Sequence, residues 1–446
     1  MTAGEEPFDI AVIGSGLAGT FATIALSHLP NVKITSYEKT DAPKEVGAWI
    51  SLTNATFDVL SNFVDINKLN RIAFKGDTNN EYLTRHWKTG EVIFRQPTFN
   101  RPRPFVEART HRIPLHDLLL SYVPPDVIRY SHDVKNLNLQ SDGTIINFTD
   151  GTSSRKHDLV VVADGIYSRI RRQFYPDGKI KYKGLVAYRS VFPASLVSHL
   201  EVKEDTSVWV KDGTVIFLSR LGLDQYGIVA ILSEPESTAS QLSWDKSTGN
   251  WGKHRLVEHF AEWDPYINDV IKSIPEIRAY PLEQAPWLSN LVIEDKIVFI
   301  GDAGHPTSGI YGSGASFGFS DVWALYRALQ ETSSNYWIKN NTPTFKYNAK
   351  LALFLFNETR RYFLQRVEQQ VSIDSQVKRE NLTEIDDKEW TDRYLIVRAG
   401  GDWIRSHNVE LEFQKVRDQY LNLLQKNVTS FKTSGKGLST LDLPKL

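Results

Sequence analysis

A glycine-rich loop near the start of the chain stands between an apolar strand and a helix. The run Phe8–Ile13 has the composition of a buried strand, and Gly14, Gly16 and Gly19 follow it with the spacing Gly-x-Gly-x-x-Gly. In such a loop the first glycine permits a tight turn, the second lets a pyrophosphate approach the backbone, and the third lets the helix pack closely on the strand. The loop therefore predicts a βαβ unit that binds a dinucleotide.

Two acidic residues extend this prediction. Glu38 ends a second apolar strand about 20 residues after the loop, where a carboxylate binds ribose hydroxyls. Much later, the apolar run Ile297–Ile300 ends at Gly301 and Asp302, and a glycine-rich turn leads into a helix from about Gly314. The first N–H groups of a helix attract electron-rich atoms, and a carboxylate at a strand end accepts from hydroxyls. This second stretch predicts an anion or ribityl site.

A third stretch repeats the pattern: a buried strand ends at Asp164-Gly165, and a helix begins near Ser168. A nicotinamide dehydrogenase explains the first site but gives no reason for the later ones. FAD needs the first site and a later one, because its ADP half occupies the first βαβ unit and its ribityl chain and ring require a second strand, turn and helix. In order and spacing, the three stretches resemble the FAD signatures Gly-x-Gly-x-x-Gly, Asp-Gly and Gly-Asp of the class A flavoprotein monooxygenases, the family of hydroxybenzoate and salicylate hydroxylases.

The resemblance implies an α/β fold with three parts. These are a Rossmann-like FAD-binding domain of the glutathione-reductase type, an inserted mixed β-sheet that binds substrate, and C-terminal helices. We expect residues 1–80, 101–180 and 285–345 in the FAD-binding domain, residues 81–100 and 181–284 in the substrate-binding sheet, and residues 346–446 in the helical region and tail. In that last region, Arg360, Arg361 and Arg366 form a charged helix face that we expect to be solvated or ion-paired.

By the same resemblance, the ADP half of FAD contacts the glycine loop and neighbouring strand ends, and the flavin half contacts an arginine and the two later motifs. The residues expected to bind the cofactor are Gly14, Gly16, Leu17, Ala18, Gly19, Glu38, Lys39, Arg112, Val134, Asp164, Gly165, Asp302, Gly312, Ser313, Gly314 and Ala315. No metal site is expected, because His254 and His259 lack metal-ligand spacing.

Three residues are candidates for catalysis. Tyr188-Arg189 matches a Tyr/Trp-Arg element near the flavin in the family, although the two also fit an ordinary cross-strand pair. His305 is a candidate base, but its position just after the Gly-Asp motif also fits a structural role. A benzoate-like substrate needs a cationic anchor, for which Arg189, Arg220 and Arg85 are candidates that the sequence does not separate.

Three departures from the family pattern lie near the flavin motifs. Gly309 stands where proline is common, Ser316 where Asn, Gly or Cys is common, and Ser320-Asp321 where Glu-Asp is usual. Glycine reduces the rigidity of a turn. We therefore expect substrate or regiochemistry to differ from the best-known members. Trp49, which the resemblance places beside the flavin, fits either a ring contact or a core position.

Composition limits the partners. The chain has 446 residues and a formal charge of −1, so no basic excess indicates nucleic acid or an anionic membrane. It contains no cysteine and nowhere as many as about 18 consecutive apolar residues, which argues against disulfides and membrane spans. We expect a cytoplasmic monomer or homodimer that binds a small aromatic substrate. The ending Pro444-Lys445-Leu446 resembles a degenerate peroxisomal Ser-Lys-Leu signal, with an unstructured tail as the alternative.

The resemblance implies a reaction in which NADH or NADPH reduces FAD, O₂ adds at flavin C4a, and the hydroperoxide hydroxylates an electron-rich aromatic ring. The best-fitting substrate is a phenolic acid of salicylate type, whose hydroxylation at the carboxylate-bearing carbon releases CO₂ and yields catechol. Two alternatives stay open. One is a biosynthetic flavin monooxygenase acting on a larger phenolic or heteroaromatic ring. The other is a non-enzymatic lipid-binding escort like the Rab GDP-dissociation inhibitors, against which the intact Asp164 and Asp302 motifs argue.

Overall fold

Three short apolar runs that are far apart in the sequence lie side by side in one sheet. In the computed structural model, β1 (Phe8–Ile13) pairs with β12 (Leu159–Val162), and β12 pairs in turn with β19 (Ile297–Phe299), all in parallel. Every residue of β12 is buried, as expected for a parallel strand covered on both faces. Because the three strands are parallel, the loops that follow them leave from the same edge of the sheet. These loops carry the three predicted motifs.

The complete sheet has the strand order β18-β19-β12-β1-β2-β8, in which β18 runs antiparallel to its neighbour and the other pairs are parallel. Its remaining strands are β2 (Val32–Tyr37), β8 (Ile128–Arg129) and β18 (Val292–Ile293). The structure describes residues 6–43, 49–75, 82–95, 107–200, 206–211, 213–242, 251–309, 312, 314–333, 346–379 and 386–434. The predictions for Ser313 and for the ending Pro444-Lys445-Leu446 fall outside these residues.

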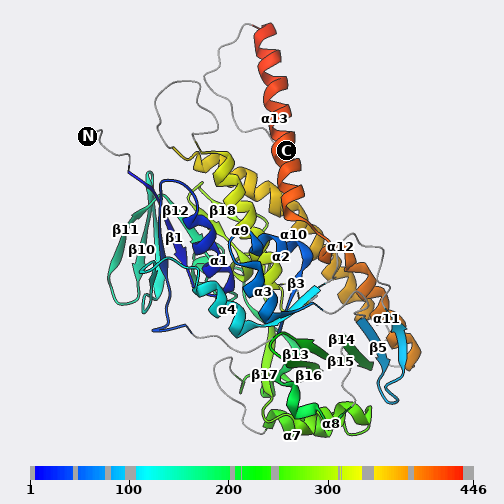
Figure 1. Ribbon diagram of the computed structural model, residues 1–446. Coiled ribbons are helices and arrows are strands. Elements are labelled where there is room, and N and C mark those ends of the chain that lie inside the picture. Colours follow the sequence, from blue (N-terminus) through cyan, green and yellow to red (C-terminus); the bar gives the residue numbers. More distant parts are fainter. Residues whose placement is uncertain are drawn as a thin grey trace.

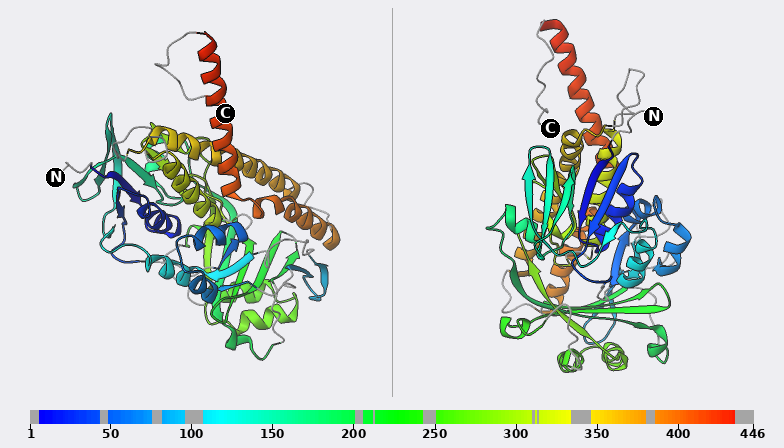
Figure 2. Two further views of the ribbon diagram at one scale, coloured as in Figure 1. Left: turned by 45° about the horizontal axis from the view of Figure 1, so that its top comes forward. Right: turned by 90° about the vertical axis from the view of Figure 1, so that its left-hand side faces the viewer.

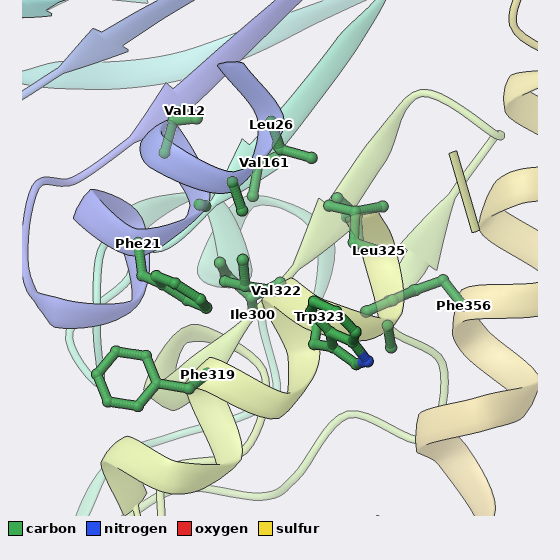
Figure 3. Close-up of a cluster of buried hydrophobic side chains, with 14 of the residues drawn as sticks. Val12, Phe21, Leu26, Val161, Ile300, Phe319, Val322, Trp323, Leu325 and Phe356 are labelled. Carbon is green, nitrogen blue, oxygen red and sulfur yellow. The ribbon is translucent and has the colours of Figure 1, made fainter. Parts of the chain in front are cut away.

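Helices α1 (Leu17–Ser27) and α9 (Gly314–Glu331) begin directly beyond two of these loops and pack against each other. The ring of Phe21 on α1 meets the ring of Phe319 on α9 edge-on, with 5.3 Å between their centroids. Figure 3 shows both rings in one apolar cluster with Val12 and Val161 of the sheet and Phe356 of the next helix. That helix is α10 (Ala349–Arg379). The start of each motif helix is therefore fixed by a continuous core.

A second, seven-stranded sheet has the order β17-β13-β16-β15-β14-β5-β6. It is mixed, because β14 and β5 are parallel and the other pairs antiparallel. Its strands are β5 (Tyr82–His86), β6 (Val92–Arg95), β13 (Lys181–Pro193), β14 (Thr206–Lys211), β15 (Thr214–Leu221), β16 (Gln225–Ser233) and β17 (Arg278–Gln284). One face buries an apolar cluster against α7 (Trp251–His259) and α8 (Pro265–Ser273), which lie on the side away from the six-stranded sheet (Figure 2).

Two small sheets and the remaining helices complete the molecule (Figure 1). The sheets have the orders β3-β7-β4 and β11-β10-β9. Their strands are β3 (Trp49–Thr53), β4 (Ala73–Phe74), β7 (Glu107–His111), β9 (Val134–Gln140), β10 (Gly143–Phe148) and β11 (Ser153–His157). The other helices and 3₁₀ turns are α2 (Asn54–Ser61), α3 (Ile66–Ile72), α4 (Arg112–Leu120), α5 (Arg169–Phe174), η1 (Ala194–Val197), α6 (Glu236–Ala239), η2 (Gly301–Ala303), α11 (Asp387–Gly400), α12 (Asp402–Arg405) and α13 (Val409–Ser434).

The observed architecture is a mixed α/β fold with parallel and antiparallel sheets followed by C-terminal helices, as predicted at that level. Strands from residues 82–95 and 181–284 share the seven-stranded sheet, whereas the exact domain boundaries stay a prediction. None of the described helices is both long enough and apolar enough to cross a membrane.

Candidate active site

In the glycine loop after β1, the backbone conformation and close packing require Gly14 and Gly19, whereas Gly16 leaves open space beside the backbone. Gly14 has a φ of +95°, and a Cβ atom on Gly19 would lie 1.9 Å from the carbonyl oxygen of Gly14. No side chain fits at Gly19 without moving the loop. Gly16 instead has a φ of −68°, and a Cβ atom there would meet nothing nearer than Nη2 of Arg112, at 4.0 Å. The space beside Gly16 therefore suits a ligand, with a guanidinium at its margin.

Glu38 is partly buried at the end of β2 and holds the loop. One carboxylate oxygen accepts the N–H and hydroxyl of Ser15, at 2.8 and 3.0 Å, and the other accepts the N–H and hydroxyl of Thr40, at 3.0 and 3.1 Å. Burial acts to raise the pKa of Glu38, but these donors outweigh it and the pKa is lowered. Four donors use the capacity of a carboxylate, so a ribose hydroxyl would have to replace one of the two side-chain hydroxyls.

The other residues predicted around the ADP half differ in their setting. Leu17 is buried. Ala18 lies so close to α9 that a Cβ atom on Gly318 would be 3.0 Å from the Cβ of Ala18. Lys39 is exposed, and Val134 is buried at the start of β9. Of this group, Ala18 has a packing role that joins the first motif to the third.

Arg171 joins the second motif to the third and was not predicted. It lies one turn into α5, just after Asp164-Gly165, and its side chain is buried. Its guanidinium donates to the carbonyl of Ile166 and, at 3.3 Å, to the carbonyl of Asp302. Burial lowers its pKa, and the nearby carboxylates of the two motifs oppose that shift. The sequence shows only that an arginine follows the Asp164-Gly165 motif by a few residues. It does not show that this arginine donates to the carbonyl of Asp302.

The carboxyl group of Asp164 is held where ionisation is costly. Its side chain hydrogen-bonds with Ser168, and burial raises its pKa to about 6. Its Oδ1 atom is buried and has no partner among the described residues. A buried acceptor without a donor calls for a ligand or water at this point. Gly165, which follows it, has a φ of +79° and so suits the turn that starts the motif.

Asp302 faces solvent at the edge where the three loops meet. Its side chain is exposed, yet the surrounding protein raises its pKa, against the opposing charges of His305, Arg112 and Arg171. Desolvation by the surrounding protein is the largest cause of this shift. A Cβ atom on Gly314, the first residue of α9, would be 4.0 Å from its Oδ1. Gly312 is exposed with a φ of +64°, and Ala315 is half-buried in the first turn of α9.

A buried carboxylate, Asp321 of α9, fixes the turn that carries Asp302. Its oxygens accept the N–H of Gly301 at 2.7 Å, Nε2 of His305 at 2.6 Å and Nε of Arg360 at 2.7 Å. Burial alone would raise the pKa of Asp321, but these partners lower it overall. His305 therefore lies in a buried network, 1% exposed, rather than at the solvent-facing edge. The sequence predicted that Arg360 is either solvated or ion-paired. It is ion-paired, and it is fully buried rather than on a solvated face.

The structure separates the candidate residues of the seven-stranded sheet. Tyr188 and Arg189 point to opposite faces, as neighbours on a strand must. Tyr188 is buried beneath the helices and donates to Oε1 of Glu234 at 2.8 Å. Arg189 lies on the other face, over the ring of Tyr280, and a Cβ atom on Gly309 would be 3.6 Å from its Nη2. Burial and the charge of Arg112 both lower the pKa of Arg189.

The other two candidate anchors lie elsewhere. Arg85 is buried and donates to Oγ of Ser207 at 2.9 Å and to the carbonyl of Gly90 at 3.0 Å. Arg220 pairs with Asp224 at 3.1 Å. Of the three, Arg189 alone is near the Gly-Asp turn. Gly309 in that turn has a φ of +77°, which proline cannot adopt, so the turn differs in conformation from one with the family's usual proline.

Comparison with known proteins links this geometry to one class of enzyme. No protein-family model matches the chain. It is 28% identical over 328 residues to a 6-hydroxynicotinate 3-monooxygenase from Bordetella bronchiseptica, covering 72% of this chain and 83% of the relative. It is 27% identical over 323 residues to a 3-amino-4-hydroxybenzoate 2-monooxygenase from Streptomyces cremeus, covering 72% and 78%. It is 24% identical over 352 residues to a salicylate hydroxylase from Pseudomonas putida, covering 73% and 78%.

Solved structures of other proteins have the same fold. HpxO from Klebsiella pneumoniae, complexed with FAD and uric acid, superposes with a TM-score of 0.70 at 18% identity, over 91% of this chain and 96% of that one. A salicylate hydroxylase substrate complex gives a TM-score of 0.72 at 17% identity, over 93% and 98%. The chain is a relative of the class A flavin-dependent monooxygenases.

These findings confirm the predicted family, the predicted kind of enzyme and FAD as its cofactor. The relatives named above are all monooxygenases or hydroxylases, which favours a monooxygenase over an escort protein. The residues around the three loops fit FAD: open space at Gly16, an unpartnered buried oxygen on Asp164 and an exposed carboxylate on Asp302. The individual contacts stay predictions.

The raised pKa of Asp164 predicts how this monooxygenase responds to pH. Its folded-state pKa of about 6 exceeds the ordinary aspartate value of 3.8, so the folded protein binds more protons between these values than the unfolded chain does. Stability from this group is therefore full below about pH 4 and lost as the pH rises through about 6. We expect the Asp164→Asn apoprotein to gain on the order of 2 kcal/mol in unfolding free energy over wild type between about pH 4 and pH 7.

Urea unfolding of both apoproteins across this range measures the difference. Asp150→Asn is the matched control. Hydrogen bonds from Thr152 lower the pKa of exposed Asp150, so the stability change on substitution should have the opposite sign. A stability difference between Asp164→Asn and wild type that does not change with pH would show that the Asp164 pKa is not raised.

Arg360 is predicted to act on FAD through Asp321. Replacing one partner of a buried ion pair leaves the other charge unpaired, at a cost of about 3–5 kcal/mol. Arg360→Met should therefore loosen the Gly301–His305 turn and weaken FAD binding by more than about tenfold, with Arg360→Lys in between. Flavin fluorescence quenching measures the affinity. The control is Arg361→Met, since partly exposed Arg361 pairs only with Glu358 along the same helix, at 2.8 Å, among the described contacts. Equal FAD affinity in Arg360→Met and Arg361→Met would refute this role.

Proposed function

We propose that the chain is an NAD(P)H-consuming monooxygenase that hydroxylates a phenolic aromatic acid, with decarboxylative hydroxylation of a salicylate-type substrate as the first candidate. The observation that carries this proposal is the position of Arg189. It is a cation on the face of the seven-stranded sheet opposite α7 and α8, beside the turn that follows Asp302. A site of this kind suits a planar ring that bears one carboxylate.

Bound FAD would supply the redox chemistry, accepting a hydride from NADH or NADPH and activating O₂. The chain's own residues would bind and orient it. Gly16 and Arg112 would receive the pyrophosphate, and Asp302 would accept hydrogen bonds from ribityl hydroxyls. The Asp321 network keeps Asp302 at its place on the edge of the sheet.

The face of the sheet around Arg189 would hold the substrate. Arg189 pairs across the strands with Val229, and Val229 with Phe217, so these three form one row on this face. Val229 and Phe217 are half-buried rather than fully covered. Apolar side chains would cover the faces of the ring and exclude water, while the guanidinium would pair with the carboxylate in a dry setting. Tyr188 and His305 would serve by holding the sheet and the Asp302 turn.

The overall reaction balances without further reactants. For salicylate, one O₂, one NAD(P)H and two protons give catechol, CO₂, NAD(P)⁺ and water. One oxygen atom enters the ring at the carbon that loses CO₂, and the other leaves as water.

A second candidate substrate is a hydroxylated pyridine carboxylic acid. The 28% identity to a 6-hydroxynicotinate 3-monooxygenase favours it. Such an acid has the same size and the same single carboxylate, so Arg189 would bind both in the same manner.

NADH and NADPH oxidation by the FAD-loaded protein tests the proposal. It would be followed with and without salicylate, each monohydroxybenzoate and 6-hydroxynicotinate, with catechol and CO₂ assayed. Stimulation by salicylate with one CO₂ per catechol supports the first candidate, and stimulation by 6-hydroxynicotinate alone supports the second. Bound yellow FAD without stimulation by any of these acids would reject simple ring acids.

Arg189→Gln should separate substrate binding from cofactor binding. Loss of a charge-assisted bidentate pair in a dry site costs about 2–4 kcal/mol, so kcat/KM should fall by roughly 30-fold to 1000-fold, mostly through KM. FAD affinity should stay within about threefold of wild type, because the adenosine and ribityl contacts are unchanged. Arg220→Gln, on the exposed Asp224 pair, is the control. Steady-state kinetics of both variants with the best acid checks this, and an unchanged KM in Arg189→Gln would remove Arg189 as the anchor.

A further inference from the structure

Trp49 begins β3 at a place where three parts of the site come together. It pairs with His111 of β7, and Arg112 follows His111 directly. Burial alternates along β3: Ile50 and Leu52 are core residues, whereas Trp49 and Ser51 are only partly buried. Trp49 and Ser51 therefore share the face that is turned away from the core.

The contacts of Ser51 show which residues lie next to this face of β3. A Cβ atom on Gly312 would lie 3.9 Å from the Ser51 hydroxyl, and the Ser316 hydroxyl donates to the Ser51 carbonyl at 3.3 Å. Gly312 and Ser316 lie on either side of Gly314, the first residue of α9, in the stretch that follows the Gly-Asp turn. The side chain of Trp49, two residues before Ser51, is therefore on the side of the strand that faces the site.

The seven-stranded sheet leaves room for the Trp49 side chain by using a glycine. A Cβ atom on Gly227 of β16 would lie 2.5 Å from Cε3 of Trp49 and 3.2 Å from its Cβ. Gly227 does not have a positive φ, so its backbone would accept any residue. The absence of a side chain at 227 is thus a requirement of space: the Trp49 ring lies directly on the sheet at that position.

Strand pairing locates this contact relative to Arg189. Gly227 pairs with Val191, two residues along β13 from Arg189, and Val229 pairs with Arg189 itself. Residues two apart on a strand point to the same face, so Trp49 and Arg189 lie on one face of the sheet. With about 7 Å between alternate residues and about 5 Å between strands, the backbone positions of Gly227 and Arg189 are roughly 9 Å apart. Side chains that leave one face of a sheet this close together can contact the same small ligand, so Trp49 and Arg189 would border one binding site.

We propose that the Trp49 side chain, seated on Gly227, forms the wall opposite Arg189 and limits the substrate to a single aromatic ring. Arg189 binds the carboxylate, and the indole blocks the far edge of the ring. This inference rests on the proposed function and names the size class of its substrate.

The test uses two ortho-hydroxy acids that differ by one fused ring, salicylate and 1-hydroxy-2-naphthoate. We expect the wild-type enzyme to prefer salicylate. Trp49→Ala should raise the ratio of kcat/KM for the naphthoate over that for salicylate by about tenfold or more. Removing the indole frees a volume equal to several methylene groups, and the fused ring of the naphthoate can fill it. Trp49→Phe should have a smaller effect in the same direction, and FAD affinity should stay near that of wild type in both. If 6-hydroxynicotinate proves to be the substrate, it and its benzo-fused analogue replace this pair.

Gly227→Ala provides the matched control variant. In the wild-type background the added methyl should displace the indole toward the substrate and lower kcat/KM for salicylate by about tenfold. In the Trp49→Ala background the same methyl has free space, and its effect should fall to about twofold or less. This non-additivity is a result that a general loss of stability would not give.

The outcomes separate the two proposals. If the wild-type protein oxidises NAD(P)H with none of the acids, the proposed function fails and the size limit with it. If the wild type turns over salicylate but the ratio is unchanged in Trp49→Ala and Trp49→Phe, the size limit alone is overturned. Loss of FAD from Trp49→Phe and Gly227→Ala alike would also overturn it, because Trp49 would then belong to the cofactor site or the core.

Discussion

The buried carboxylate of Asp321 ties together three segments on which the active site depends. Gly301 and His305, in the turn after β19, supply two of its donors, and Arg360 on α10 supplies the third, so the carboxylate joins this turn and α10 to its own helix α9. A fully buried charge is costly unless each lone pair meets a donor, so the three segments must arrive together or the carboxylate is left unsatisfied. The position of Asp302 is therefore set by a residue on α10, 58 positions later than Asp302 itself.

Close packing then transmits this position to the rest of the site. The Cβ of Ala18 lies near Gly301 and Gly318, so the first motif helix touches both the Gly-Asp turn and α9. Arg171 adds a second link, donating from the Asp-Gly motif to the carbonyl of Asp302. Each of the three loops is thus held by the other two. A site assembled in this way presents its polar groups with little freedom to reorganise, which is what binding an extended cofactor requires.

Local patterns in the sequence predicted the three motifs because each is a strand, turn and helix within about 20 residues. The groups that join the motifs could not be predicted, since Asp321, Arg171 and Arg360 act across the fold. Arg360 looked like part of a charged helix face, and only the approach of α10 to α9 turns it into a buried ion pair. Alternation along β13 shows that Tyr188 and Arg189 face opposite ways, but which face meets the site depends on where α7 and α8 pack.

The seven-stranded sheet meets the small β3-β7-β4 sheet and the end of α3 where glycines allow close approach. A Cβ atom on Gly222 would be 2.1 Å from the carbonyl of Ile72, and one on Gly227 would be 2.5 Å from Trp49. The six-stranded sheet supplies the cofactor loops, and the seven-stranded sheet supplies a face with Arg189 on it. Residues on that face can change without altering the strands that carry the loops. The relatives, at 24% to 28% identity, are named for different ring acids, and on the proposed function such differences would lie on that face. Substrate choice should therefore be sought in the row of Arg189, Val229 and Phe217 and in the Trp49 side chain, not in the three motifs.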